Sequence, residues 1–333
     1  MREIRPDDPT LDWQGVIEVE HGDQGSRGWR LPLSRIDLFP GAGLQQQAAR
    51  QAGVRLVFGT DTGSIAGRLS VAPDEVRTPK LDLVVDDQRV GTVAPGEDGR
   101  FVFDDLPRGP KQVELWLPQF GDLWLTRIEV DEQASIWRAV PTNRPRMIVY
   151  GSSISHCYEA DSPTQTWPAL VARKLGFDLN CLGFSGQCHL DPMVGRLIRD
   201  QPADVIITCL GINVHRSGAF NERSFLPAVL GLLSTIRDGH PGVPLLVISP
   251  ICCPEREDDV AAAGMTLAQM RAQVGEAVRL LHDHGDDAIE LLDGLDVLGP
   301  DQVDLLGDGL HPNADGYRLM ASRIAPVVQQ LTR

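Results

Sequence analysis

The sequence predicts two domains, an antiparallel β-sandwich of the jelly-roll kind followed by an α/β domain built on a parallel sheet. Two observations lead to this prediction. Residues 1–140 contain short apolar runs separated by turn residues, a pattern typical of all-β proteins. From Met147 onward, apolar strand-like runs alternate with longer amphipathic runs, which is typical of a parallel sheet covered by helices. We place a proline-containing linker at 141–146 and the second domain at 147–333.

The first domain is predicted to consist mainly of strands. The strand-like runs lie at 15–25, 35–43, 54–63, 81–93, 99–109, 112–122 and 123–132. Only GLQQQAARQA, residues 43–52, has a helical composition. Short strands at this spacing indicate a two-layered antiparallel fold.

The second domain is predicted to alternate strands and helices. The strand-like runs lie at 146–151, 179–186, 204–211, 244–250 and 289–295. Helical runs lie at 166–176, 191–200, 223–239, 267–285 and 314–331. Ligands of such sheets bind beyond the carboxyl ends of the strands, so we expect the functional residues there.

Composition limits the classes of partner. The 333 residues include 46 Asp and Glu against 31 Lys and Arg, a formal net charge of −15. This balance argues against nucleic acid as a partner, because binding phosphates requires clustered basic residues. The N-terminus has no apolar signal segment and no run is long enough to cross a bilayer, so we expect a cytoplasmic protein without a membrane partner. The six cysteines are expected to be reduced and buried.

Four loops combine residue types with complementary chemistry. They are GSSIS (151–155), GFSGQ (183–187), GINVH (211–215) and GDGLHPNADGY (307–317). A serine becomes a nucleophile when a nearby base takes its proton and a third group orients that base. Asp308 and His311 could supply the carboxylate and the base, while Gly186 and Asn213 could supply hydrogen-bond donors to a developing oxyanion.

These four motifs, in this order between residues 147 and 331, resemble the SGNH hydrolase family, the GDSL-type esterases and lipases. The resemblance implies a flavodoxin-like α/β sheet and a catalytic triad of Ser153, Asp308 and His311. It also implies an oxyanion hole formed by the Ser153 backbone N–H, Gly186 and Asn213.

The sequence departs from the family pattern at two motifs. Gly151-Ser152-Ser153 stands where the family has G-D-S, and Val214 follows Asn213 where the family has an aspartate. The motifs are similar to those of a bacterial branch that has an N-terminal β-sandwich, and RIDLF at 35–39 resembles the G-x-D-L-Y signature of that sandwich. Because neighbours of the triad differ, the resemblance leaves the substrate open.

Other residues have competing interpretations. Ser185 is interpreted as a turn residue, because GFSGQ is not a G-x-S-x-G nucleophile elbow. Cys188 beside His189 could indicate a thiol nucleophile, although no family signature surrounds the pair.

Three side chains are possible substrate-binding residues, His156, His215 and Phe120. The histidines lie close to Ser153 and Asn213 in the sequence, and Phe120 lies in a predicted loop of the first domain. The sequence contains no H-x-x-x-H or C-x-x-C pair, and Asp308 and His311 already have a role, so we expect no metal and no cofactor.

The sequence therefore predicts a serine esterase that hydrolyses carboxylic esters through an acyl-enzyme. A carbohydrate ester or another small-molecule acyl ester is the first expectation for the substrate. Two alternatives remain, an acyltransferase that uses the same site and a lipase or lysophospholipase acting on lipid esters. A non-enzymatic binding protein is disfavoured, because an idle site has no physical need to retain all these groups. The oligomeric state is left open.

Overall fold

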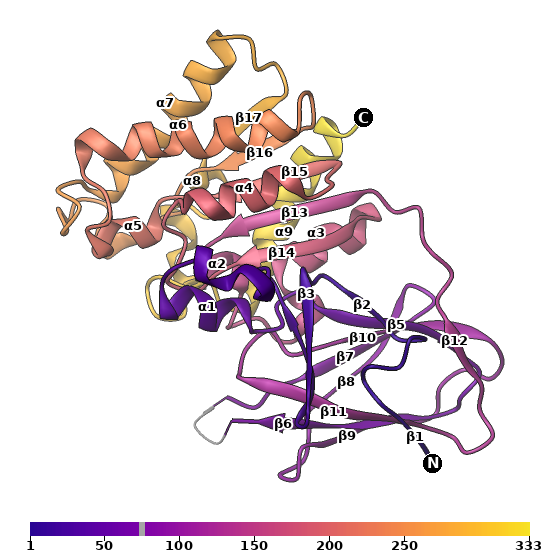
Figure 1. Ribbon diagram of the computed structural model, residues 1–333. Helices are drawn as coiled ribbons and strands as arrows, with labels where there is room; N and C mark the ends of the chain where they lie inside the picture. The colour runs from indigo at the N-terminus through magenta and orange to yellow at the C-terminus, as the bar shows by residue number, and fades with distance from the viewer. Residues whose placement is uncertain (73–76) are drawn as a thin grey trace. The chain divides into compact units, whose positions relative to one another are not determined.

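The computed structural model describes residues 1–72 and 77–333, and the chain forms two compact units (Figure 1). Unit 1 consists of Met1–Ile36, Ala48–Asn143 and Ser162–Thr164, and unit 2 of Asp37–Gln47, Arg144–Asp161 and Gln165–Arg333. The predicted linker at 141–146 spans the point after Asn143 where the chain leaves unit 1. Residues 37–47 lie in the part of the sequence predicted to form the first domain, but they belong to unit 2. Residues 162–164 lie in the part predicted to form the second domain, but they belong to unit 1.

Unit 1 contains two antiparallel sheets. In the first, β3 (Glu18–Gly22), β4 (Gly25–Trp29), β11 (Leu123–Val130), β6 (Ile65–Val71) and β9 (Arg100–Phe103) follow in this order, and β1 (Arg2–Ile4) pairs with β11. In the second, the order is β12 (Ile136–Arg138), β5 (Arg55–Thr60), β10 (Lys111–Trp116), β7 (Leu81–Val85) and β8 (Gln88–Val93), and β2 (Asp12–Gln14) pairs with β5.

Apolar side chains of both sheets form one core. Leu56 and Phe58 of β5 belong to it, as do Leu125 and Ile128 of β11, and all four are buried. The inward residues alternate with more exposed ones along β11, as expected for a strand with one buried face. The predicted antiparallel all-β domain is confirmed.

One predicted strand run in this half of the sequence has another structure. The residues of 35–43 lie in a 3₁₀ helix, η1 (Leu33–Leu38), and at the start of α1 (Ala42–Ala48). Pro32 and Pro40 flank η1, and a proline cannot donate a ladder hydrogen bond. The apolar residues of RIDLF therefore occur in a helical turn rather than in a sheet.

Unit 2 is built on a parallel sheet. The strand order is β14 (Asp178–Gly183), β13 (Arg146–Gly151), β15 (Val205–Cys209), β16 (Leu245–Ile248) and β17 (Ile289–Leu292). Numbered along the chain within the sheet, this is the order 2-1-3-4-5 of flavodoxin-like folds. The predicted α/β domain is confirmed.

The long helices form two groups on the two faces of this sheet (Figure 1). In one group, α3 (Trp167–Leu175) packs on α9 (Ala314–Leu331). In the other, α6 (Glu222–Gly239) packs between α4 (Pro192–Asp200) and α7 (Leu267–Asp283). Shorter helical segments are α2 (Ser153–His156), α5 (Ile212–Ser217), α8 (Gly294–Val297), η2 (Pro163–Gln165), η3 (Pro254–Arg256) and η4 (Pro300–Leu305).

Local sequence explains where several helices begin. The Thr166 side chain accepts a hydrogen bond from the Ala169 N–H and caps α3, which ends at Gly176 in the left-handed region. Thr266 and Gln269 form a capping box at the start of α7. Over residues 1–72 and 77–333, no helix is both long enough and apolar enough to span a membrane.

A buried carboxylate in unit 1 organises the segment 162–164. Asp82 in β7 is fully buried, and its Oδ2 accepts hydrogen bonds from the Ser162 hydroxyl (2.6 Å), the Thr164 N–H (2.8 Å) and the Thr164 hydroxyl (2.6 Å). Its Oδ1 accepts a hydrogen bond from the Thr92 hydroxyl. A buried carboxylate is tolerated only when it is hydrogen-bonded in this way.

We expect Asp82→Ala to lower the free energy of unfolding by about 3 kcal/mol, because it leaves several buried donors without an acceptor. The urea midpoint measures this change. Asp98→Ala is the matched control, since Asp98 pairs with Arg68 at an exposed position and its loss should change the midpoint little. Equal midpoints for the two variants would contradict this account of Asp82.

Candidate active site

The candidate site lies at the carboxyl edge of the parallel sheet. Strand β13 pairs with β14 on one side and with β15 on the other, and Gly151 lies opposite both Gly183 and Cys209. The segments that follow these three strands therefore begin side by side at the same edge of the sheet. They contain Ser153, Gly186 and Asn213.

Ser153 opens the short helix α2. The preceding Ser152 is the N-cap, and its hydroxyl accepts a hydrogen bond from the Ile154 N–H (3.2 Å). Ser153 is therefore the first helical residue, and the helix itself offers no acceptor for its backbone N–H. The position leaves that N–H available to a substrate oxygen.

A glycine at the end of β14 allows α2 to lie against the sheet. A Cβ atom at Gly183 would be 2.6 Å from the His156 nitrogen and 2.9 Å from the Ser155 carbonyl oxygen. Contacts this short with backbone atoms would displace the helix. Gly183 therefore helps to determine the position of Ser153.

The side chains of Ser153, His311 and Asp308 form a continuous chain of polar contacts. The Ser153 Oγ lies 2.9 Å from the His311 Nε2, and the His311 Nδ1 lies 2.7 Å from the Asp308 Oδ2. The structure thus joins residues separated by 158 positions in the sequence. This is the geometry in which a histidine can take the proton of a serine hydroxyl.

Asp308 also organises its own turn. Its Oδ1 accepts hydrogen bonds from the backbone N–H groups of Leu310 (3.0 Å) and His311 (2.7 Å). Partial burial acts to raise the pKa of Asp308, but the bonds from the His311 backbone, the His311 ring and the Leu310 N–H outweigh it and lower the pKa to about 2. An ionised Asp308 accepts the Nδ1 proton, which leaves Nε2 to accept the proton of Ser153.

Asn213 is oriented by a neighbouring backbone group. It lies in α5 after Gly211, which has a φ of 112°, and its Oδ1 accepts a hydrogen bond from the Cys188 N–H (3.0 Å). This bond leaves the Asn213 Nδ2 as a donor for another acceptor. The sequence analysis missed Cys188 in this role, because a backbone N–H has no residue-type signature.

Gly186 lies in a tight turn after β14. The Gln187 N–H bonds to the Phe184 carbonyl (3.0 Å), and Gly186 has a φ of 70°, a conformation that favours glycine. The residue is exposed, as a donor to a substrate oxygen must be. Its part in an oxyanion hole stays a prediction.

The structure buries the three possible substrate-binding side chains. His156 and His215 are fully buried, and the His215 Nε2 lies 2.9 Å from the Asp259 carbonyl oxygen. Phe120 lies in unit 1 with 7% of its surface exposed. The structure does not bring these side chains to an open surface, so their contact with substrate stays a prediction.

The cysteine alternative is disfavoured by the surroundings of Cys188. The side chain is buried, and burial raises the pKa of this thiol well above its ordinary value of 9.0. A cysteine nucleophile reacts as the thiolate, which such an environment suppresses.

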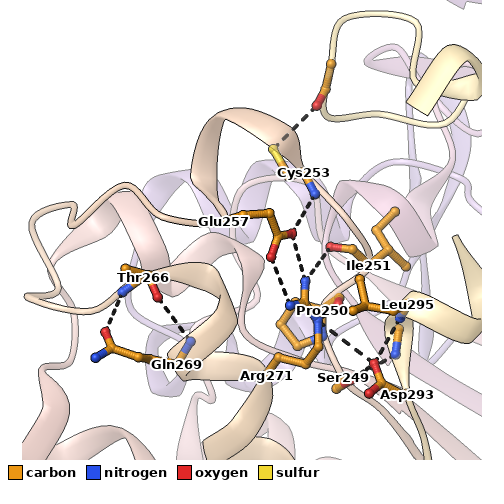
Figure 2. A network of polar contacts seen from close by, with 12 residues as sticks. Ser249, Pro250, Ile251, Cys253, Glu257, Thr266, Gln269, Arg271, Asp293 and Leu295 are labelled. Atoms are coloured by element: carbon orange, nitrogen blue, oxygen red, sulfur yellow. Dashed lines mark hydrogen bonds and ion pairs between the residues drawn. The ribbon is translucent and has the colours of Figure 1, made fainter. Parts of the chain in front are cut away.

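A polar network connects the loop after β16 with the turn of Asp308 and His311 (Figure 2). Arg271 of α7 forms hydrogen bonds of 2.8 and 2.9 Å with the two carboxylate oxygens of Glu257, and it also donates to the Pro250 carbonyl (2.8 Å). Glu257 Oε1 accepts the Cys253 N–H (3.0 Å), and the Cys253 thiol donates to the Gly309 carbonyl (3.4 Å). This loop is therefore anchored on one side and in contact with the turn on the other.

Two family models match the chain. Residues 149–319 match the GDSL-like lipase/acylhydrolase family, and residues 11–126 match the N-terminal domain of SsfX3. No curated protein matches the sequence.

Several solved structures are similar over most of the chain. The salicylyl-acyltransferase SsfX3 from a tetracycline biosynthetic pathway is 33% identical, with a TM-score of 0.89, and the match covers 100% of this chain and 99% of SsfX3. A GDSL-like lipase from Bacteroides ovatus is 22% identical, with a TM-score of 0.83 and coverages of 99% and 97%. A family two carbohydrate esterase from Clostridium thermocellum is 16% identical, with a TM-score of 0.65 and coverages of 84% and 93%. At these identities the last two show a shared fold.

The orientation of Asn213 leads to a test. An amide that donates only to a developing oxyanion affects kcat, so Asn213→Ala should lower kcat roughly a hundred- to a thousand-fold with little change in KM. Asn213→Asp is the companion variant, because it keeps an oxygen for the Cys188 N–H but removes the donor, and kcat should fall similarly. Steady-state kinetics on a p-nitrophenyl ester measures both values. A variant that mainly raises KM would place Asn213 in ground-state substrate binding.

Proposed function

Because this chain belongs to the GDSL-like lipase/acylhydrolase family, we propose that it is a serine esterase that cleaves carboxylic esters through an acyl-enzyme on Ser153. The observation that carries this proposal is the contact chain from Ser153 through His311 to Asp308, with distances of 2.9 and 2.7 Å. The three side chains supply a nucleophile, a base and a group that orients the base.

In the first half of the proposed reaction, the Ser153 Oγ attacks the carbonyl carbon of the ester while its proton passes to the His311 Nε2. The ionised Asp308 stabilises the imidazolium that forms. The imidazolium then protonates the leaving alcohol as the ester C–O bond breaks. The acyl group remains on Ser153.

In the second half, water takes the place of the alcohol. His311 accepts a proton from the water molecule as the water oxygen attacks the acyl carbonyl. The Ser153 oxygen leaves with the proton returned by His311, and the carboxylic acid is released. In both halves, negative charge on the carbonyl oxygen is stabilised by the Ser153 N–H, the Gly186 N–H and the Asn213 amide.

A second candidate function is acyl transfer to an alcohol. It is favoured by the 33% identity to a salicylyl-acyltransferase over 100% of the chain. The acyl-enzyme is the same in both cases, and only the acceptor differs. The same identity favours esters of small organic molecules as substrates, whereas the carbohydrate esterases support carbohydrate esters through their fold alone.

We expect a fluorophosphonate probe to label the wild-type protein on Ser153 and to leave Ser153→Ala unlabelled. Turnover of a p-nitrophenyl ester should fall by several orders of magnitude in that variant with no loss of folding, because Ser153 is the attacking group. Ser185→Ala is the matched control in the neighbouring loop and should react normally. Labelling that persists in Ser153→Ala and disappears in Ser185→Ala would reverse the assignment.

Analysis of the products shows whether water or an alcohol accepts the acyl group from Ser153. With p-nitrophenyl esters from acetate to palmitate in buffer, we expect the free acid to form. With a panel of alcohols and phenols in excess, we expect a new ester as well, at a rate that depends on Ser153. Mass spectrometry measures the ratio of acid to new ester. Formation of the new ester no faster than with Ser153→Ala would exclude the acyltransferase.

A further inference from the structure

Arg256 is a half-buried cation without a counter-ion. Within the part of the chain that the structure describes, its side chain forms one hydrogen bond, from Nη1 to the Ile212 carbonyl, at a long 3.4 Å. No carboxylate in the described residues forms an ion pair with it. By comparison, Arg237 and Arg271 in the same unit are each paired, with Asp286 and Glu257 respectively. A partly desolvated guanidinium without such a partner is costly unless a ligand supplies one.

Two carboxylates adjoin Arg256 in the sequence. Glu255 is exposed and forms no ion pair with Arg256, and Glu257 is already engaged. Glu257 follows Arg256 directly, but both of its oxygens are bonded to Arg271 (Figure 2). The network that holds Glu257 also holds Cys253 against the Gly309 carbonyl. The segment from Cys253 to Glu257 is therefore anchored, and Arg256 is carried on a fixed backbone rather than on a free loop.

Arg256 lies beside the groups proposed to perform the chemistry. Its hydrogen-bond acceptor, Ile212, directly precedes Asn213. Burial lowers the pKa of Arg256 most, and the guanidinium of Arg216 lowers it further. Cys253, Glu255 and, last, Asp308 act to raise it. The guanidinium is thus an electrostatic neighbour of both Asp308 and Arg216.

Arg216 adds a second positive charge at this place. It follows Ile212 by one helical turn in α5, it is exposed, and no ion pair to it forms within the part of the chain that the structure describes. Two like charges near each other repel unless an anion lies between them. The chain has 46 acidic and 31 basic residues, so two arginines without an ion pair are unexpected in a protein with an excess of carboxylates.

We propose that Arg256, with Arg216 beside it, binds an anionic group of the substrate, a carboxylate or a phosphate. The inference rests on the proposed function, because it specifies the chemistry of the ester that reaches Ser153. The planar fork of a guanidinium matches the two oxygens of such a group and binds it in a defined orientation. The anion can belong to the acyl part or to the alcohol part of the ester.

Two pairs of esters separate these sources. For the acyl part, the pair is p-nitrophenyl hydrogen adipate and its neutral methyl ester. For the alcohol part, the pair is 4-acetoxybenzoate and its neutral methyl ester. In both compounds the acetyl group is the one transferred to Ser153. In each pair the compounds differ by one negative charge at nearly constant size, and the measured quantity is the ratio of kcat/KM for the anion to kcat/KM for the neutral ester.

In wild-type protein we expect this ratio to favour the anion in one of the two pairs, and that pair identifies the part of the ester that is charged. Arg256→Gln should lower the ratio about ten- to a hundred-fold, the range expected for a charge-assisted hydrogen bond. Arg256→Lys should give an intermediate ratio, because it keeps the charge and loses the fork. Arg223→Gln is the matched control, an exposed arginine of α6, and should leave the ratio unchanged.

Failure of the inference and failure of the proposed function give different results. Equal ratios in wild type and Arg256→Gln, with the neutral esters turned over, would overturn the anion site and leave the esterase intact. The same conclusion follows if Arg223→Gln lowers the ratio as much as Arg256→Gln does. If wild type turns over none of the four esters and a fluorophosphonate does not label Ser153, the proposed function itself is wrong.

Discussion

The carboxylate of Asp308 is the group on which the geometry of the candidate site depends. It accepts two backbone hydrogen bonds within its own turn and contacts the imidazole of His311 with its other oxygen. The same contacts shape the turn, select the ring tautomer and hold the pKa of Asp308 at about 2. The shape of the turn therefore depends on the charge of Asp308, because protonation of this carboxylate would weaken the bonds that position His311. At neutral pH the carboxylate is ionised and the arrangement is maintained.

The nucleophile side of the site depends on the sheet. Gly151 of β13 lies opposite Gly183 and Cys209, and the missing Cβ at Gly183 leaves room for the backbone of α2. Ser153 is held by this backbone packing, whereas His311 is held by the hydrogen bonds of Asp308. The two halves of the site have separate supports, and the hydrogen bond between the Ser153 hydroxyl and the His311 ring joins them.

Much of the fold could be predicted from the sequence, because the buried strands of unit 2 and the alternating strands of unit 1 follow simple periods of hydrophobicity. The assignment of two short segments to the units could not be predicted. Asp37–Gln47 belongs to unit 2 and Ser162–Thr164 belongs to unit 1, through contacts with residues distant in the sequence. In the candidate site, side chains in recognisable motifs were predictable, as for Ser153 and His311. The Cys188 N–H and the unpaired charge of Arg256 were not, since their meaning depends on neighbours that only the fold supplies.

The openness of the site bears on the choice between hydrolysis and acyl transfer. The His311 side chain is 28% exposed and that of Asp308 is 60% exposed, so both side chains are in contact with solvent. An alcohol acceptor must therefore compete with water for the same imidazole, and it can do so only if binding raises its effective concentration next to the acyl group. A triad alone gives no such advantage. The outcome must then be determined by contacts outside the triad that hold the acceptor. The Arg256 guanidinium, bonded to the Ile212 carbonyl next to Asn213, is the group that we propose for an acceptor or acyl group that bears a negative charge.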